Sequence, residues 1–100
     1  PNYLIQKDID KSSWFGFSLI IKPNSNLKRK DIINILQKNK IECRPIVTGN
    51  FVRNEVMKYF DYEVHEELKN ANHLHDNGFF VGNSHKCLSK NINFLSQILS

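Results

Sequence analysis

Two short apolar runs, rich in aromatic residues, alternate in this chain with segments that have helical periodicity. The first run, "WFGFSLII" at 14–21, is followed by the turn formers of "KPNSN", a combination typical of a strand and its closing turn. The second run, "FFVGN" at 79–83, predicts a brief buried strand. Strands that alternate with helices restrict the chain to a mixed α/β architecture.

The segments beside these runs predict amphipathic helices. We expect one helix from about Lys28 to Asn39, because apolar residues recur there every three or four positions, at Ile32, Ile35 and Leu36. The carboxy-terminal "LSKNINFLSQILS" repeats this pattern, with Ser89 as its expected cap.

The middle of the chain predicts smaller elements. "IECRPIV" alternates like a strand, and Pro45 requires an edge or a strand end because proline has no amide hydrogen. "RNEVMKYF" predicts a short helix that packs Val56, Met57 and Phe60. "ANHLHDNG" predicts one or two helical turns that stop at Asn77 and Gly78.

Together these elements predict an α/β (α+β) two-layer sandwich, with the helices packed on one face of a small sheet. One hundred residues make one domain, 1–100, and no apolar stretch approaches the roughly 20 residues of a membrane span. We therefore expect a soluble domain. The chain opens on Pro1 without an initiator Met or a secretory leader, so we interpret it as a fragment of a longer protein.

Most familiar catalytic and metal motifs are missing. The histidines His65, His73, His75 and His85 and the cysteines Cys43 and Cys87 show no CxxC, HxxxH or HExxH spacing, which argues against zinc and favours free thiols. The glycines are isolated, so no phosphate-binding loop is indicated.

Nucleic-acid binding is the alternative of another class. The net charge of +4 is concentrated in the first half, in the helix that begins near Lys28, and the aromatic strands could stack bases. However, a solvated helix face and a hydrophobic core explain the same residues, and no RNP-type string is present. Affinity that falls steeply with salt would distinguish such a module.

The stretch "RPIVTGNFVRN", at 44–54, is the strongest candidate site. Arg44 and Arg53 flank the turn formers Thr48, Gly49 and Asn50 directly after a strand, and such a mixture can fix hydroxyls and an anion at a loop beside a rigid sheet. An equally good interpretation is that Gly49 and Asn50 only form a turn while Arg53 caps a helix.

Several motifs resemble one enzyme family. "SSWFGFSLII", "IECRPIVTGNFVRNEVMKYFDYEVHE" and "NANHLHDNGFFVGNSH" are similar to the carboxy-terminal segment of the DegT/DnrJ/EryC1/StrS family of sugar aminotransferases and dehydrases, which are vitamin B6 enzymes. The resemblance implies the small domain of a fold type I enzyme, like that of aspartate aminotransferase. It also implies that the cofactor site and the catalytic residues belong to a large domain outside this chain.

Within the family, the motifs resemble the nucleotide-sugar 3-dehydratases of O-antigen and lipopolysaccharide deoxysugar synthesis, with a nucleotide-sugar aminotransferase as the alternative. The implied cofactor is pyridoxal 5'-phosphate or its pyridoxamine form, and the implied substrate is a nucleotide-linked 4-keto-6-deoxyhexose. A histidine or a lysine at an upstream position would decide between the two activities. The resemblance further implies a homodimer, whereas the free thiols favour the reducing cytoplasm. We expect no nucleic-acid or membrane partner, and we expect this chain alone to be inactive.

The resemblance also indicates which residues approach the substrate. Those in the "RPxxTGN" region and the "GN-x-H" turn are expected to bind it, namely Arg44, Thr48, Asn50, Arg53, Asn83 and His85. Trp14 either lines the entrance to the same substrate site or belongs to the hydrophobic core. Lys86 and Cys87 match no family pattern.

Overall fold

The computed structural model covers all residues, 1–100, and contains four strands and three α-helices. In chain order the elements are β1 (Tyr3–Ile5), β2 (Gly16–Ile21), α1 (Arg29–Lys38), β3 (Cys43–Pro45), the 3₁₀ turns η1 (Phe51–Arg53) and η2 (Glu55–Tyr59), α2 (Lys69–Asn77), β4 (Gly78–Gly82) and α3 (Ser89–Leu99). None of the helices combines the length and apolar character needed to cross a membrane.

The strands form one sheet in the order β1-β2-β4-β3, and every neighbouring pair is antiparallel. Phe80 in β4 lies between Ser18 of β2 and Arg44 of β3. Pro45 ends an edge strand, as its missing amide hydrogen predicts. The other edge strand, β1, was not predicted.

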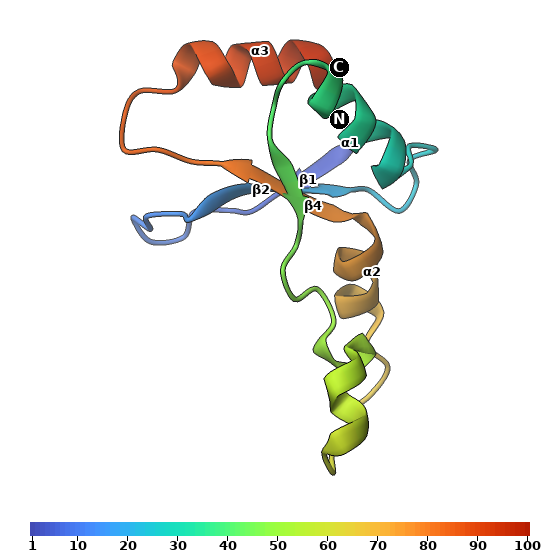
Figure 1. The fold of residues 1–100 in the computed structure, drawn as a ribbon. Helices are drawn as coiled ribbons and strands as arrows, with labels where there is room; N and C mark the ends of the chain where they lie inside the picture. Colours follow the sequence, from blue (N-terminus) through green and yellow to red (C-terminus); the bar gives the residue numbers. More distant parts are fainter.

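One face of this sheet carries the core. Alternate residues of β2 and β4 point to the same side, where α1 and α3 cover them (Figure 1). The buried cluster contains Leu19, Ile21, Ile32, Leu36, Phe79, Val81 and Leu95. The predicted two-layer sandwich is therefore confirmed, and its hydrophobic burial is concentrated on this single face.

The opposite face of the sheet is open over much of its area. The directly paired residues Leu4 and Ile20 share this face, as do Ser18, Phe80 and Arg44. Leu4 is 44% exposed, and Phe15, which lies 6.1 Å from Phe80 between ring centroids, is 89% exposed. We call this side of the sheet the open face.

Residues 51–68, here called the arm, leave the sheet and extend away from it (Figure 1). The prediction of a short helix that packs into the core here is wrong, since Val56 is 38% exposed and Phe60 is 59% exposed. The segment instead forms two 3₁₀ turns. The Asn50 side chain caps the first by accepting from the Val52 amide, and that of Asn54 caps the second by accepting from the Val56 amide.

The helices begin and end close to the predicted positions, but their caps differ. No side chain caps α1 or α3, and Ser89 is the first residue of α3 rather than its cap. Helix α2 starts earlier than predicted, at Lys69, and ends at Asn77 as expected. Gly78 follows it in an extended conformation, and a Cβ there would lie 2.6 Å from the Leu74 carbonyl oxygen, so close packing requires the glycine.

Hydrogen bonds to α2 fix the base of the arm. Asn50 is only 6% exposed, and its side-chain amide donates to the Asn72 Oδ1 atom at 2.8 Å. Its backbone amide donates to the His75 Nδ1 atom at 3.3 Å. A Cβ on Gly49 would lie 2.5 Å from the His75 Cα atom, so the chain passes against α2 with no room for a side chain.

Two arginines strengthen this junction. Arg53 forms an ion pair with Asp76 of α2 at 2.8 Å. Arg29 of α1 donates to the His75 and Gly78 carbonyl oxygens at 2.6 and 3.2 Å. Helix α2 therefore holds both the arm and the loop that precedes it.

Because only one face of α1 is buried, alanine substitutions at two neighbouring positions should lower the free energy of unfolding by very different amounts. Leu36 is fully buried, whereas Ile35 is 40% exposed. We expect Leu36→Ala to lower the free energy of unfolding by about 2–5 kcal/mol, because it removes core contacts and leaves a cavity. Urea denaturation should show a clearly smaller loss for Ile35→Ala. Equal losses would contradict the proposed core.

The junction with α2 implies that the two asparagine caps, Asn50 and Asn54, contribute differently to the free energy of unfolding. Asn50→Ala should lower the free energy of unfolding by about 1–3 kcal/mol, because it removes a cap and the hydrogen bond that the buried Asn50 amide group donates to Asn72. Asn54→Ala removes an exposed cap of the same kind, so we expect a loss of at most about 1 kcal/mol. Thermal or urea unfolding would measure both. Indistinguishable variants would show that the contact with Asn72 contributes nothing.

Candidate functional site

Three shallow depressions form a continuous series, which runs from the base of the arm across the open face to the loops at the end of the sheet. The central one, of about 450 Å³, is lined by residues that include Trp14, Ser18, Thr48 and Phe80. It shares Val47 and Thr48 with a depression of about 380 Å³ at the base of the arm. It shares Trp14 with a third, of about 410 Å³, at the end of the sheet where β2 begins and β4 ends.

The structure brings the predicted site residues to this series. Thr48, Asn50 and Arg53 line the depression at the arm base. Asn83 and His85 line the depression at the other end. Arg44 lines none of the three but lies on the same face, paired with Phe80. The two sequence regions thus lie at the two ends of one series of depressions, and their contact with a substrate stays a prediction.

The environments of these residues suit different roles. Arg44 is exposed and forms only a surface ion pair with Glu42 at 2.9 Å, an interaction worth at most about 1 kcal/mol, so its guanidinium can turn to another anion. Asn50, in contrast, uses its side-chain oxygen and its amide group within the protein. Arg44 is therefore suited to direct contact with a ligand, and Asn50 to holding the loop in place.

Asn83, at the far end of the series, holds two adjacent loops together. The side-chain amide of Asn83 donates to the Trp14 carbonyl oxygen at 2.8 Å, which joins the loop before β2 to the loop after β4. The remaining polar lining of this depression comes from Asp8, Ser12, Ser13, Ser84 and His85. These carboxylate, hydroxyl and imidazole groups can form hydrogen bonds with a polyhydroxylated ligand.

Trp14 combines the two roles that the sequence left open. Its ring stacks on Phe17 with 6.3 Å between centroids, yet it also lines two of the depressions. Its indole nitrogen is buried and has no hydrogen-bond partner. A buried donor without a partner is costly, so this nitrogen slightly destabilises the fold around Trp14.

The two free cysteines differ in their surroundings. Cys87 is exposed beside the His85 loop, and the hydrogen bond between its Sγ atom and Ser89 lowers the pKa of the thiol. Cys43 lies on the core side, where burial and, secondarily, the Glu42 charge raise the pKa of its thiol. The structure brings no group of three or more His, Cys, Asp or Glu side chains together in a metal-binding arrangement.

Sequence reasoning missed the residues that support the site. Arg29 was counted within a solvated basic helix, although it bonds to two carbonyl oxygens at the α2 junction. Asn72 and His75 had no recognisable signal, because their partners lie more than 20 positions away in the chain. The one hint in the sequence was Asn50 directly after Gly49, since a turn of this kind can bring an asparagine against a neighbouring helix.

No family model matches the chain. Curated relatives, however, match it over almost its whole length. It is 50% identical over 100 residues to GDP-4-keto-6-deoxy-D-mannose 3-dehydratase of Escherichia coli O55:H7, covering 99% of this chain and 26% of that protein. It is 47% identical to the enzyme of the same name from Yersinia pseudotuberculosis, covering 99% of this chain and 25% of that protein. The chain therefore spans about a quarter of the length of these relatives.

The solved structures that match this chain are of the same kind of enzyme. The E. coli dehydratase with bound hydrated PLP matches all of this chain and 26% of its own, with 48% identity and a TM-score of 0.95. A variant of the same kind of enzyme, ColD, with bound GDP-perosamine matches 99% of this chain and 26% of its own, with 48% identity and a TM-score of 0.94. The chain is thus a homologue of the carboxy-terminal region of GDP-4-keto-6-deoxy-D-mannose 3-dehydratases, which are DegT-type enzymes, as its motifs indicated.

Proposed function

We propose that residues 1–100 form the carboxy-terminal small domain of a PLP-dependent GDP-4-keto-6-deoxy-D-mannose 3-dehydratase. The identity of about 50% to two such enzymes over nearly the whole chain carries this proposal. It favours dehydration over the alternative of a nucleotide-sugar aminotransferase. The product would serve the synthesis of lipopolysaccharide deoxysugars in the cytoplasm, and one matched relative is named a lipopolysaccharide biosynthesis protein.

The open face would then lie against the nucleotide-sugar. Support comes from the position of the predicted site residues along one series of depressions, and from the GDP-perosamine in a homologous structure. In this arrangement Arg44 supplies a cation for an anionic or hydroxyl-bearing part of the substrate. Thr48 and His85 would donate or accept hydrogen bonds, whereas Asn50 and Arg53 hold the loop that carries Thr48. Asn83, whose side chain bonds to Trp14 and Ser84, would hold the loops at the other end of the site.

The cofactor would be held by residues outside this chain. None of the residues that line the three depressions is a lysine, the residue type that links the cofactor in the related aminotransferases. In such enzymes bound PLP supplies an electron sink for chemistry on the sugar. The small domain would contribute substrate contacts and exclude water from the other side of the site.

The proposed assembly is a homodimer that acts on the nucleotide-linked sugar without nucleic-acid or membrane partners. The support is the likeness to the dehydratases, because assembly is not visible in a single chain.

A full-length enzyme that contains this chain provides the test of Arg44. With GDP-4-keto-6-deoxymannose as substrate, we expect Arg44→Ala to lower kcat/KM at least about tenfold, because a charge-assisted contact is lost. Its free energy of unfolding should change by no more than about 0.5 kcal/mol, since the side chain is exposed. Lys38→Ala, at an exposed position of α1, should change neither quantity. Equal losses of activity and stability would make Arg44 structural.

The isolated chain should not retain the cofactor. After incubation with pyridoxal phosphate and dialysis, we expect no stoichiometric Schiff-base absorption band, because the exposed lysines form only reversible adducts. The chain should also fail to turn over the sugar. A band that survives dialysis at one equivalent would mean that a cofactor site lies within these residues.

A further inference from the structure

His75 connects helix α2 to the loop that carries Thr48 through one ring nitrogen. The Asn50 backbone amide lies 3.3 Å from the His75 Nδ1 atom. A backbone amide can only donate a hydrogen bond, so this ring nitrogen must be the acceptor. Nδ1 therefore carries no hydrogen, and the ring hydrogen lies on Nε2. The contact exists in one neutral tautomer of the imidazole and in no other state of the ring.

The second ring nitrogen has room for that hydrogen. The buried side-chain polar atoms without a partner are the Tyr3 hydroxyl and the Trp14 indole nitrogen. The His75 Nε2 atom has no protein partner and is not one of them, so it reaches solvent, where water can accept its hydrogen. His75 is half-buried and lines the depression at the base of the arm. Both ring nitrogens are thus satisfied in this tautomer.

The backbone of His75 is fixed independently of its ring. Arg29 of α1 donates to the His75 carbonyl oxygen at 2.6 Å. Gly49 packs so closely on the His75 Cα atom that a Cβ there would lie 2.5 Å from it. Of the bonds that tie this loop to α2, the one from the Asn50 amide to the ring is made by the main chain of the loop itself. The position of Thr48, two residues earlier, therefore depends directly on this contact.

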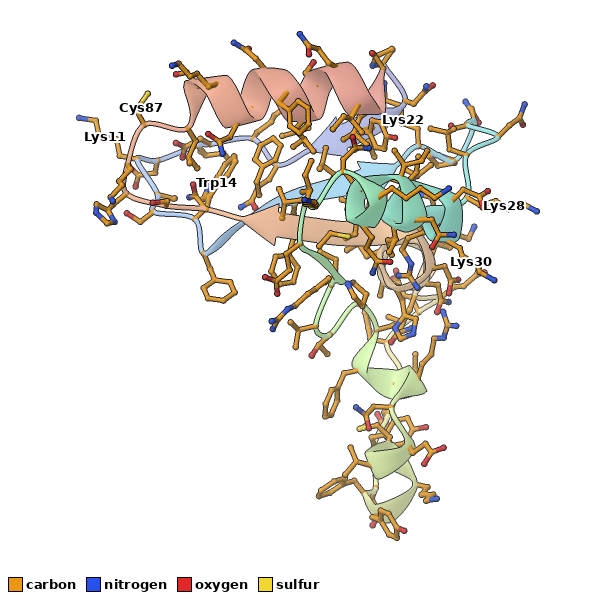
Figure 2. The ribbon with its side chains drawn as sticks, turned by 45° about the horizontal axis from the view of Figure 1, so that its top comes forward. Lys11, Trp14, Lys22, Lys28, Lys30 and Cys87 are labelled. Carbon is orange, nitrogen blue, oxygen red and sulfur yellow. The ribbon has the colours of Figure 1, made fainter.

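The charged groups around the ring are two cations and two anions, namely Arg29, Arg53, Glu55 and Asp76. Arg53 and Glu55 line the same depression as His75, and Arg53 pairs with Asp76. Lys28 and Lys30 are exposed, and Figure 2 shows them on the outer side of the start of α1. The charges that face His75 thus cancel, and the bond from Asn50 is the interaction that requires a neutral ring.

We propose that His75 is a positioning residue of the dehydratase, which holds the Thr48 loop in place only while its imidazole is neutral. A protonated imidazole carries a hydrogen on Nδ1, so it meets the Asn50 amide with a second donor and releases the loop. The inference rests on the proposed function, because it concerns a loop that would contact the nucleotide-sugar. It makes the affinity for substrate, rather than the chemical step, depend on the state of His75.

Amide hydrogen exchange at Asn50 in a full-length enzyme, measured without substrate, tests the contact itself. We expect His75→Ala to speed this exchange at least about tenfold, because the amide loses its acceptor. His75→Asn should restore the wild-type rate to within about threefold, since its Oδ1 atom lies as many bonds from Cβ as Nδ1 does and can accept. The matched control is His73→Ala on the same helix. The His73 Nε2 atom donates to the Ile21 carbonyl oxygen at 2.7 Å instead of holding the loop, so this variant should leave the exchange unchanged.

Steady-state kinetics of the same variants with GDP-4-keto-6-deoxymannose separates positioning from a general structural role. His75→Ala should raise KM at least about fivefold and change kcat by no more than about twofold, because a substrate contact is misplaced while the chemistry is unaltered. His75→Asn and His73→Ala should keep KM near the wild-type value. As pH falls from about 8 to about 5, the range in which an imidazole ordinarily gains its proton, the wild-type KM should rise relative to that of His75→Asn, whose amide stays neutral.

Unchanged exchange at Asn50 in His75→Ala would overturn the proposal. Equal rises in KM for His75→Ala and His73→Ala, or a failure of His75→Asn to restore KM, would also overturn it, because either result means a general loss of structure. A ratio of wild-type to His75→Asn KM that does not change with pH would contradict the requirement for a neutral ring. A wild-type enzyme that does not turn over this sugar would refute the proposed function, whereas the exchange experiment would still decide whether His75 holds the loop.

Discussion

One-sided burial of a four-stranded sheet is the constraint on which the rest of this structure depends. The side chains of Phe79, Ile21 and Leu36 are almost completely removed from water between the sheet and two helices. Because successive strand residues point to opposite sides, the positions that build this core leave the alternate ones on the open face. Stability and the candidate site are thus divided between the two faces of the same strands.

The second constraint is the junction at α2. A buried asparagine, a glycine without room for a Cβ and two arginines connect the loop after β3 to this helix. The junction fixes the position of Thr48 on the open face and the direction of the arm. A polar cluster beside the sheet therefore determines both the position of this loop and the direction of the arm.

The sequence predicted the elements whose pattern is local. The two central strands and the helices α1 and α3 follow from apolar periodicity, and Pro45 correctly marked the end of an edge strand. The arm could not be predicted in this way, because "RNEVMKYF" has the composition of a short packed helix but lies beyond the reach of the core. The candidate site was found through motifs, and its supporting contacts to Asn72 and His75 depend on tertiary structure alone.

In the proposed complete enzyme, the open face of the sheet lies against the nucleotide-sugar. Amide hydrogen exchange of the full-length protein, with and without a bound GDP-sugar, measures this directly. The account predicts slower exchange on binding at residues 46–50 and 83–85, which border the three depressions. Protection confined to the solvent side of α1 and α3, with no change in these two loops, would contradict it.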